Sequence, residues 1–215
     1  MNEKPRILRP TADPAEKAIL VGDPGRALLL ATELLEAPAP MFNHHRGLWG
    51  YCGPAADGSG RLLIQGTGVG GPSIRAVVTD LALLGVRRMV RLGTATSAAL
   101  PPSSVVIAEA ASINELGASS GSAELLSAAN ALVMDAHVGS VVSDDIHLPP
   151  TRESIPPPAL AADLSTLTLY SIASELGLEA LSVLVVAETA DGFVSDSELE
   201  TTFKAIAPAA RKILA

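Results

Sequence analysis

Glycines and arginines gather at points where apolar runs of the sequence give way to other structure. Gly22-Asp23-Pro24-Gly25-Arg26 follows one such run, and Arg91-Leu92-Gly93-Thr94 ends another. Backbone N–H groups at a helix start, guanidinium groups and a hydroxyl all donate hydrogen bonds to oxyanions. Ligands of α/β sheets collect at the carboxyl ends of the strands. Each arginine alone could be a surface residue, but together the two segments predict one anion site.

A third segment, Gly66-Thr67-Gly68-Val69-Gly70-Gly71, has the spacing G-x-G-x-x-G between a predicted strand and a predicted helix. A dinucleotide-binding fingerprint expects an acidic residue about 20 positions further on, to hold the ribose. The next strand ends instead in Arg91, which could suit the 2′-phosphate of NADP. A tight turn from strand to helix is the other interpretation, and for this segment taken alone it is the better one.

The elements that must position these groups alternate along the chain, which predicts an α/β fold with strands buried on both faces. The expected strands are Ala18–Val21, Leu62–Gln65, Met89–Leu92, Val105–Ala108, His137–Val142 and Leu181–Ala187. The expected helices are Pro24–Glu36, Pro72–Leu84, Ala123–Met134, Asp163–Leu176 and Asp196–Leu214. Proline just inside the start marks the first two helices, and a capping box from Ser195 to Glu198 marks the last. The proline-rich segment Leu148–Pro158 is expected to be a loop beside the site.

Composition excludes several classes of protein. With 48% hydrophobic and 18% charged residues among 215, the chain is expected to be globular, and its net charge of -8 argues against non-specific nucleic-acid binding. Aromatic residues make up 3%, too few for stacking platforms along a nucleic acid. Cys52 is the only cysteine, and the four histidines do not fall at a metal-ligand spacing, so no metal is expected. No apolar run is long enough to span a membrane and no secretory signal opens the chain, which predicts a cytoplasmic protein.

The motifs VGDPGR, NHHRG, GTGVGGPS and LGVRRMVRLGT follow one another in the first half of the chain. In this order and at these intervals they resemble the nucleoside phosphorylases that assemble as trimers or hexamers, and most of all uridine phosphorylase. The resemblance is strong over residues 18–111, continues through 137–144 and is fainter over the last helices. It implies a single domain over residues 1–215, built as a three-layer αβα sandwich with a mixed central β-sheet.

The resemblance also implies a phosphate site. One subunit would supply Gly22, Arg26, Arg91 and Thr94, and a neighbouring subunit would supply Arg46. The protein would then be a homo-oligomer of dimers that share sites, and we expect a hexamer. Arg46 follows His44 and His45, and this segment could equally be a polar hairpin.

On the nucleoside side the chain departs from the pattern of the family. The implied nucleoside-binding positions are Arg6, Val69, Ala95, Thr96, Ile146, Arg152, Leu164 and Ser165. Ser165 stands where the family has a glutamate for the ribose hydroxyls, Thr96 replaces a glycine, and Arg6 replaces a histidine at the 5′-hydroxyl. Around the base only Arg152 matches, while Glu188 falls where the family has an acid or arginine near the leaving base. Val69 and Leu164 would pack on the sugar.

These correspondences imply a pentosyl transfer in which nucleoside and inorganic phosphate give free base and ribose 1-phosphate. Arg91 and Glu188 would be catalytic, with no metal or organic cofactor, and neither nucleic acid nor membrane would be a partner. The altered ribose side predicts a preference for 5′-modified or 2′-deoxy substrates, unless Arg6 belongs to a loose N-terminus.

Several alternatives remain open. A non-catalytic paralogue that binds a phosphorylated ligand is favoured by Ser165 and Thr96; a nucleosidase of the same fold and an NADP-dependent oxidoreductase follow. Asp144 and Asp145 could replace the lost carboxylate, or they could cap a turn.

Overall fold

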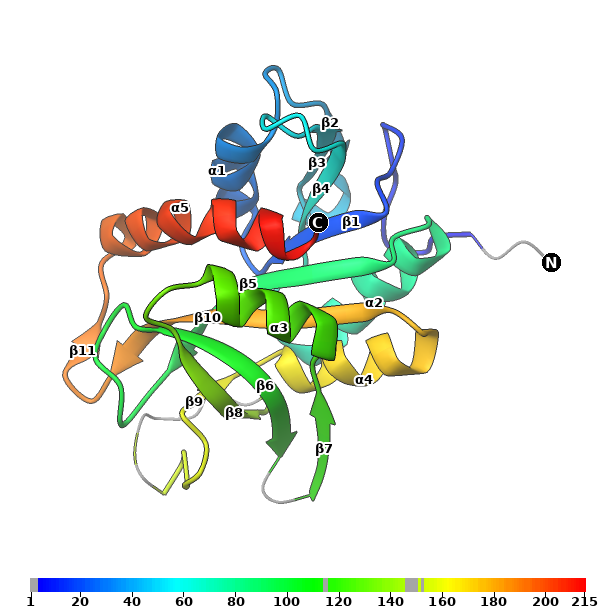
Figure 1. Cartoon of the computed structure of the whole chain (residues 1–215). Helices are drawn as coiled ribbons and strands as arrows, with labels where there is room; N and C mark the ends of the chain where they lie inside the picture. Colours follow the sequence, from blue (N-terminus) through cyan, green and yellow to red (C-terminus); the bar gives the residue numbers. More distant parts are fainter. Residues whose placement is uncertain (1–3, 114–115, 146–150, 152) are drawn as a thin grey trace.

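The computed structural model describes residues 4–113, 116–145, 151 and 153–215, and it shows a mixed sheet flanked by helices (Figure 1). The helices are α1 (Pro24–Leu34), α2 (Gly70–Leu83), α3 (Ala123–Leu132), α4 (Thr166–Leu176) and α5 (Asp196–Ile213), with a short 3₁₀ turn, η1, at His45–Gly47. The strands are β1 (Lys17–Val21), β2 (Met41–Asn43), β3 (Gly50–Pro54), β4 (Arg61–Gly66), β5 (Arg88–Thr96), β6 (Val105–Ile113), β7 (Leu116–Ser120), β8 (His137–Ser143), β9 (Ala161–Asp163), β10 (Glu179–Thr189) and β11 (Gly192–Phe193).

Four parallel strands form the centre of the sheet, in the order β4, β1, β5, β10. In the register, Val21 at the end of β1 lies beside Gly66 of β4 on one side and Leu92 of β5 on the other. The carboxyl ends of these strands therefore open on one edge, as the sequence predicts. Antiparallel neighbours extend the sheet on both sides, β3 beside β4 and β6 beside β10.

Two hydrophobic clusters cover the two faces of the sheet. Leu20 belongs to the cluster that includes α2 and α4, whereas its neighbour Ile19 belongs to the cluster that includes α1, α3 and α5. Successive side chains of a strand point to opposite faces, so apolar residues at both positions require helices on both sides. The layers are thus helix, sheet, helix, and the predicted αβα class with a mixed sheet is confirmed.

Part of the sheet closes on itself. β5 pairs with β10, β10 with β6, β6 with β8, β8 with β9, and β9 returns to β5 through the pair Thr96 and Ala162. This five-strand ring brings the ends of β5, β9 and β10 together although they are far apart in sequence. They form one wall of the site.

The structure corrects some predicted boundaries. The predicted helix from Asp163 begins only at Thr166, because residues 161–163 form β9. Helix α2 begins at Gly70, which puts Pro72 at its third position rather than its first. The predicted capping box is confirmed, since the Ser195 side chain accepts from the Glu198 backbone and the Glu198 side chain accepts from the Ser195 backbone.

Candidate active site

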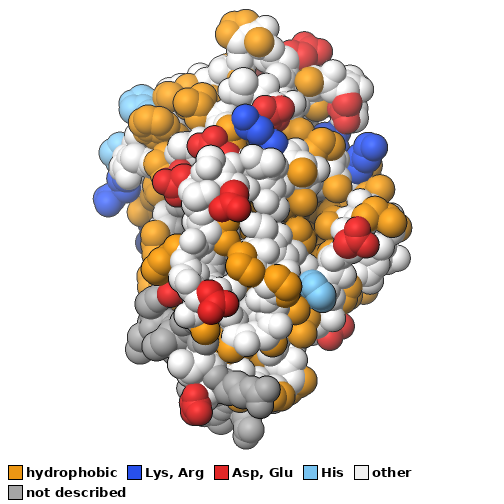
Figure 2. Space-filling view, turned by 90° about the vertical axis from the view of Figure 1, so that its left-hand side faces the viewer, with side chains coloured by type: hydrophobic (Ala, Val, Ile, Leu, Met, Phe, Trp, Pro, Cys, Tyr) orange, Lys and Arg blue, Asp and Glu red, His pale blue; other side chains and the backbone are white. Residues whose placement is uncertain are grey.

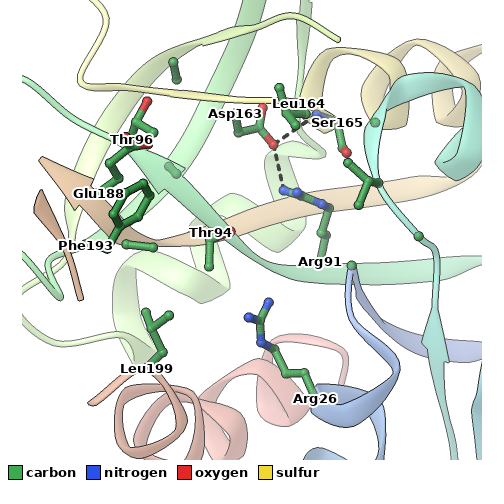
Figure 3. A pocket seen from close by; sticks show the side chains of 17 residues that line it. Arg26, Arg91, Thr94, Thr96, Asp163, Leu164, Ser165, Glu188, Phe193 and Leu199 are labelled. Carbon is green, nitrogen blue, oxygen red and sulfur yellow. Dashed lines mark hydrogen bonds and ion pairs between the residues drawn. The ribbon is translucent and has the colours of Figure 1, made fainter. Parts of the chain in front are cut away.

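A cavity of about 360 Å³ opens at the carboxyl edge of the parallel strands (Figure 3). Most of the residues that the sequence predicts for the site line it, namely Gly22, Arg26, Val69, Arg91, Thr94, Ala95, Thr96, Leu164, Ser165 and Glu188. They come from the ends of β1, β5 and β10, from the start of α1, and from the turns that follow β4 and β9. The fold therefore assembles one compartment from segments spread over most of the chain.

Two guanidinium groups face this compartment, Arg26 from α1 and Arg91 from β5 (Figure 3). Burial lowers the pKa of Arg26 most, and the charge of Arg91 lowers it as well, against the opposite effect of Asp23. The Arg26 guanidinium also lies over the ring of Phe203, 4.1 Å from its centroid, which orients it as a cation–π pair. Two cations that repel each other across a cavity favour an anion between them.

Asp163 holds Arg91 in place. Arg91 Nη1 lies 2.8 Å from Asp163 Oδ2, and the Asp163 side chain has no exposed surface. The same carboxylate accepts hydrogen bonds from the Ser165 N–H at 3.2 Å and from the Thr166 hydroxyl at 2.8 Å, so it also caps the start of α4. A buried carboxylate with this many donors is fixed, and it fixes the guanidinium that it binds.

The glycine of the Arg91-Leu92-Gly93-Thr94 motif has a direct role. A Cβ added to Gly93 would lie 2.5 Å from Arg91 Nη1, because the guanidinium folds back over this glycine. Residues two apart on a strand share a face, so the spacing Arg-x-Gly makes room for the arginine head. The motif is explained by packing as well as by its donors.

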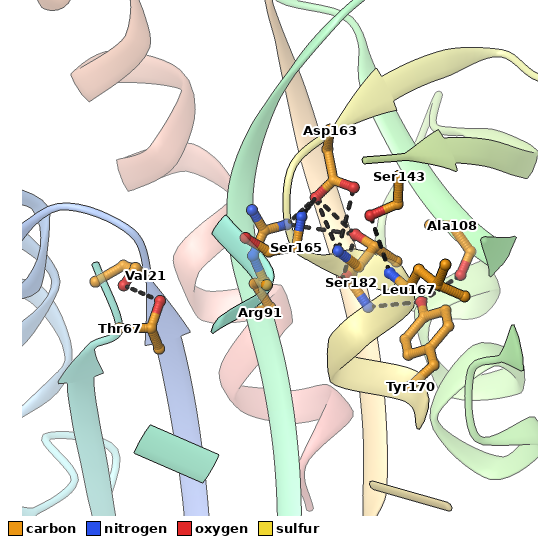
Figure 4. Close-up of polar contacts among 12 residues, drawn as sticks. Val21, Thr67, Arg91, Ala108, Ser143, Asp163, Ser165, Leu167, Tyr170 and Ser182 are labelled. Atoms are coloured by element: carbon orange, nitrogen blue, oxygen red, sulfur yellow. Dashed lines mark hydrogen bonds and ion pairs between the residues drawn. The ribbon is translucent and has the colours of Figure 1, made fainter. Parts of the chain in front are cut away.

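A chain of buried polar groups continues behind Arg91 (Figure 4). The Thr166 hydroxyl is hydrogen-bonded to the Ser182 hydroxyl at 3.1 Å, and the Ser182 N–H donates to the Tyr170 oxygen at 2.9 Å. Tyr170 in turn donates to the carbonyl of Ala108, and burial raises its pKa. The hydroxyl is therefore a permanent donor at neutral pH, and the network is a rigid support for the arginine.

At the start of α1 one predicted donor is occupied. The Asp23 side chain accepts from the Arg26 N–H at 2.8 Å and caps the helix. The helix cap therefore uses this N–H, while the Arg26 guanidinium lies on the cavity wall.

The glycine-rich segment forms a tight turn from β4 into α2. Gly68 has φ +72°, and a Cβ there would lie 2.6 Å from the Ser73 hydroxyl, which itself donates to the Thr67 carbonyl at 2.6 Å. Asp145 accepts from the Gly71 N–H at the start of α2. The Asp145 side chain therefore caps the start of α2 rather than a turn in its own loop. Asp144 donates its backbone N–H to the Asp163 carbonyl at 3.0 Å.

The end of the cavity away from the arginines is less polar, and the sequence did not predict all of it. Phe193 of β11 and Leu199 of α5 line it together with Thr96 and Glu188 (Figure 3). Asp191-Gly192, directly before Phe193, is a dipeptide typical of a hairpin turn and could have indicated the short strand. Further wall residues that were not predicted are Gly68, Gly70, Ala162, Asp163 and Ala187.

Two predicted residues do not line the cavity of their own chain. Arg46 lies exposed in η1, with φ 60°. The Arg6 side chain is exposed as well, but its segment is tied down, because Asp80 accepts from the backbone N–H groups of residues 6, 7 and 8 at 2.6 to 2.9 Å. The alternative of a loose N-terminus is therefore wrong for these residues. The predicted base residues Ile146 and Arg152 lie outside the described residues.

Residues 16–215 match the family model of the phosphorylase superfamily. The chain belongs to this superfamily. The match covers every described residue of the cavity, so the edge of the sheet that carries the cavity is part of the family's own fold.

Known relatives cover most of this chain. A protein named purine nucleoside phosphorylase DeoD-type from Caldanaerobacter subterraneus subsp. tengcongensis is 34% identical over 200 residues, 82% of this chain and 84% of its own length. Proteins of the same name from Clostridium perfringens and Streptococcus uberis are 32% and 30% identical over 88% and 89% of this chain and 89% and 90% of their own. The family resemblance is confirmed. However, these relatives are named purine nucleoside phosphorylases, whereas the sequence motifs indicated a closer resemblance to uridine phosphorylase.

Two further findings concern the described residues. None of their helices has the length and apolar character needed to cross a membrane. No group of three or more His, Cys, Asp or Glu side chains gathers among them in a way that could hold a metal ion.

Proposed function

We propose that this protein cleaves the N-glycosidic bond of a nucleoside with inorganic phosphate and releases free base and a pentose 1-phosphate. The observation that carries the proposal is the polarity of the cavity. Arg26 and Arg91 face one end, while Phe193, Leu199 and small side chains line the other. A nucleoside and phosphate together have this pattern, with an anion at the sugar and a flat base beyond it.

In the proposed reaction Arg26, Arg91 and Thr94 bind phosphate beside Gly22, and Arg91 is held ready by Asp163. Phosphate bound by fixed donors keeps little hydration and is aimed at the anomeric carbon, where positive charge develops as the bond to the base breaks. Val69, Leu164 and Ser165 lie along the cavity where the sugar would sit. The Glu188 carboxylate, on the wall at the other end, would act on the leaving base.

We infer that a purine nucleoside is the first candidate for the substrate, because the relatives are named purine nucleoside phosphorylase. A uridine phosphorylase-like preference, indicated by the motifs, is the second. Ser165 supplies a hydroxyl where a carboxylate would pair with the ribose hydroxyls, which favours 2′-deoxy or 5′-modified sugars.

We further infer a homo-oligomer in which Arg46, and with it Arg6, reaches the site of a neighbouring subunit. The smallest such assembly is a dimer, and we expect the full assembly to be a hexamer. Both side chains are exposed and away from their own cavity, which supports this arrangement. We place the reaction in the cytoplasm, in keeping with a single, buried cysteine. Residues 1–215 would act as one catalytic domain without metal or organic cofactor.

The test is a screen of inosine, guanosine, adenosine, uridine, thymidine and the 2′-deoxy forms, with and without phosphate, following release of free base. Phosphate-dependent release confirms the proposal, and a chelator is expected to leave the rate unchanged. Release without phosphate would show a nucleosidase. Binding of phosphorylated compounds with no release would show a non-catalytic paralogue and would refute the proposed reaction.

A further inference from the structure

Phe193 differs from the other phenylalanines of the chain. Phe42 and Phe203 have no exposed surface, whereas Phe193 is 79% exposed. Its side chain nevertheless faces a defined place, the wall of the cavity at the end away from Arg26 and Arg91 (Figure 3). A large apolar side chain left in water at the mouth of a cavity is a candidate ligand contact.

The backbone holds this side chain in position. β11 pairs antiparallel with the end of β10, with Phe193 opposite Glu188 and Gly192 opposite Thr189. The Val194 N–H donates to the Ala187 carbonyl at 2.8 Å and continues the ladder. Gly192 has φ +124°, a conformation that side chains disfavour, so the glycine permits the bend that brings Phe193 over the cavity.

The rest of this end suits a flat ligand. Ala95, Ala162 and Ala187 contribute only methyl groups to the wall, and Leu199 adds an aliphatic side chain. The Glu188 carboxylate, cross-strand from Phe193, is the acidic group at this end. An aromatic face beside small residues and a carboxylate matches a heteroaromatic ring with N–H groups at its edge.

We propose that Phe193 is the platform on which the nucleobase stacks, and that it favours bases with a larger ring system. This inference rests on the proposed function, because it assigns the base end of the same cavity. Stacking depends on the area of overlap, so a two-ring purine gains more from Phe193 than a one-ring pyrimidine. Phe193 is then a specificity-determining residue, supplied by a two-residue strand.

The test compares Phe193→Ala, Phe193→Leu and Phe193→Trp with wild type. For Phe193→Ala we expect the KM of purine nucleosides and the Kd of free purine to rise about 5- to 100-fold, as one lost stacking contact predicts. The Kd of phosphate is expected to stay unchanged. Phe193→Trp restores binding, while Phe193→Leu, which keeps apolar area without a ring, does not. Met134→Ala is the control, since Met134 is 78% exposed and does not line the cavity.

Calorimetry with free bases separates this inference from the proposed function. If wild type cleaves no nucleoside but binds a base in a way that depends on Phe193, the proposed reaction fails and the platform stands. If wild type cleaves nucleosides, and Phe193→Ala changes neither the KM of purine nucleosides nor the Kd of free purine, the platform is refuted. Wild type that binds no base, or equal losses for purines and pyrimidines, would also overturn it.

Discussion

The two arginines of the cavity are held in different ways. Arg91 is almost completely buried and paired with a carboxylate that has no exposed surface, whereas Arg26 rests on the face of Phe203. Removing Arg91 would leave Asp163 buried without its cation, which is strongly destabilising. Arg26 is therefore the better residue for measuring the contribution of a single guanidinium to anion binding.

We predict that Arg26→Ala weakens phosphate binding about 10- to 100-fold, the range for one charged hydrogen-bonding group. Calorimetry with inorganic phosphate measures this directly. Arg75→Ala is the matched control, because Arg75 forms an exposed ion pair with Glu175 and does not line the cavity. Equal phosphate affinity in wild type and Arg26→Ala would contradict the assignment of the anion site.

Gly93→Ala tests the position of Arg91 while its charge is retained. The added methyl would meet the guanidinium, so Arg91 must leave its place over Gly93 and its contact with Asp163 is disturbed. We expect phosphate affinity to fall at least about tenfold, as for the loss of one charged hydrogen bond. A variant that folds like wild type and binds phosphate equally well would show that this packing is not needed.

Among the elements, α5 offers a test of local stability. Its capping box joins Ser195 and Glu198 at the exposed start of the helix. Ser195→Ala is expected to lower the free energy of unfolding by about 1 kcal/mol, the usual effect of losing such an N-cap. Urea unfolding measures it, with Ser127→Ala on the exposed face of α3 as the control. No difference between the two variants would mean that the cap contributes nothing.

The same cap predicts a pH dependence. The hydrogen bonds from Ser195 lower the pKa of Glu198 in the folded protein. A lowered folded-state pKa stabilises the fold above the unfolded pKa, and this stabilisation is lost as the pH falls through the folded pKa. Glu198→Gln is therefore expected to differ most from wild type at neutral pH and to converge with it in acid. Unfolding curves of both proteins, recorded from neutral to acid pH, measure this difference. A difference that grows toward acid pH would contradict the prediction.

Long elements were easier to predict from the sequence than short ones. The parallel strands are mostly apolar runs such as Leu181–Ala187, in which Ser182 is the one polar residue, and burial on both faces leaves that pattern. β9 spans only residues 161–163 and pairs with β5 through a single residue, so no periodicity marks it. Its last residue, Asp163, was assigned to the helix that it in fact caps.

The candidate site was predicted where donors belong to recognisable sequence motifs, as at Arg26 and Arg91. Phe193 and Leu199 were missed because their place depends on how a short hairpin and α5 pack beside the sheet ends. The buried partner of Arg91 was missed for a similar reason. The pair joins residues 72 positions apart, and only the closure of the five-strand ring brings them together.

At the scale of the whole molecule, acidic residues outnumber basic ones by 23 to 15. Figure 2 shows acidic side chains spread over one face, with hydrophobic groups between them. Such a surface repels anions in general, so in the proposed function the local arginines would have to select phosphate.

The proposed assembly predicts complementation between inactive subunits. If Arg46 completes a neighbour's site, then Arg46→Ala and Arg26→Ala, each weak alone, regain activity when refolded together. In a mixed dimer one site combines the intact Arg26 of one chain with the intact Arg46 of the other. Random pairing into dimers restores about a quarter of wild-type activity.

Two Arg26→Ala preparations refolded together are the control and stay weak. Sedimentation of the wild type accompanies the experiment. A stable monomer, or no recovery in a mixture that does contain mixed dimers, would show that the sites are not shared.

The charges around the cavity have a consequence for the ionic form of phosphate. Among the described wall residues, the formal charges of Arg26 and Arg91 are cancelled by those of Asp163 and Glu188. A phosphate dianion that enters such a neutral compartment leaves two negative charges without a counterion, which costs free energy away from bulk water. An isolated subunit would therefore bind the monoanion and take up a proton. A site completed by a neighbour's Arg46 would take up fewer protons when phosphate binds. Proton uptake makes the calorimetric heat of phosphate binding depend on the buffer. This dependence therefore reports on assembly.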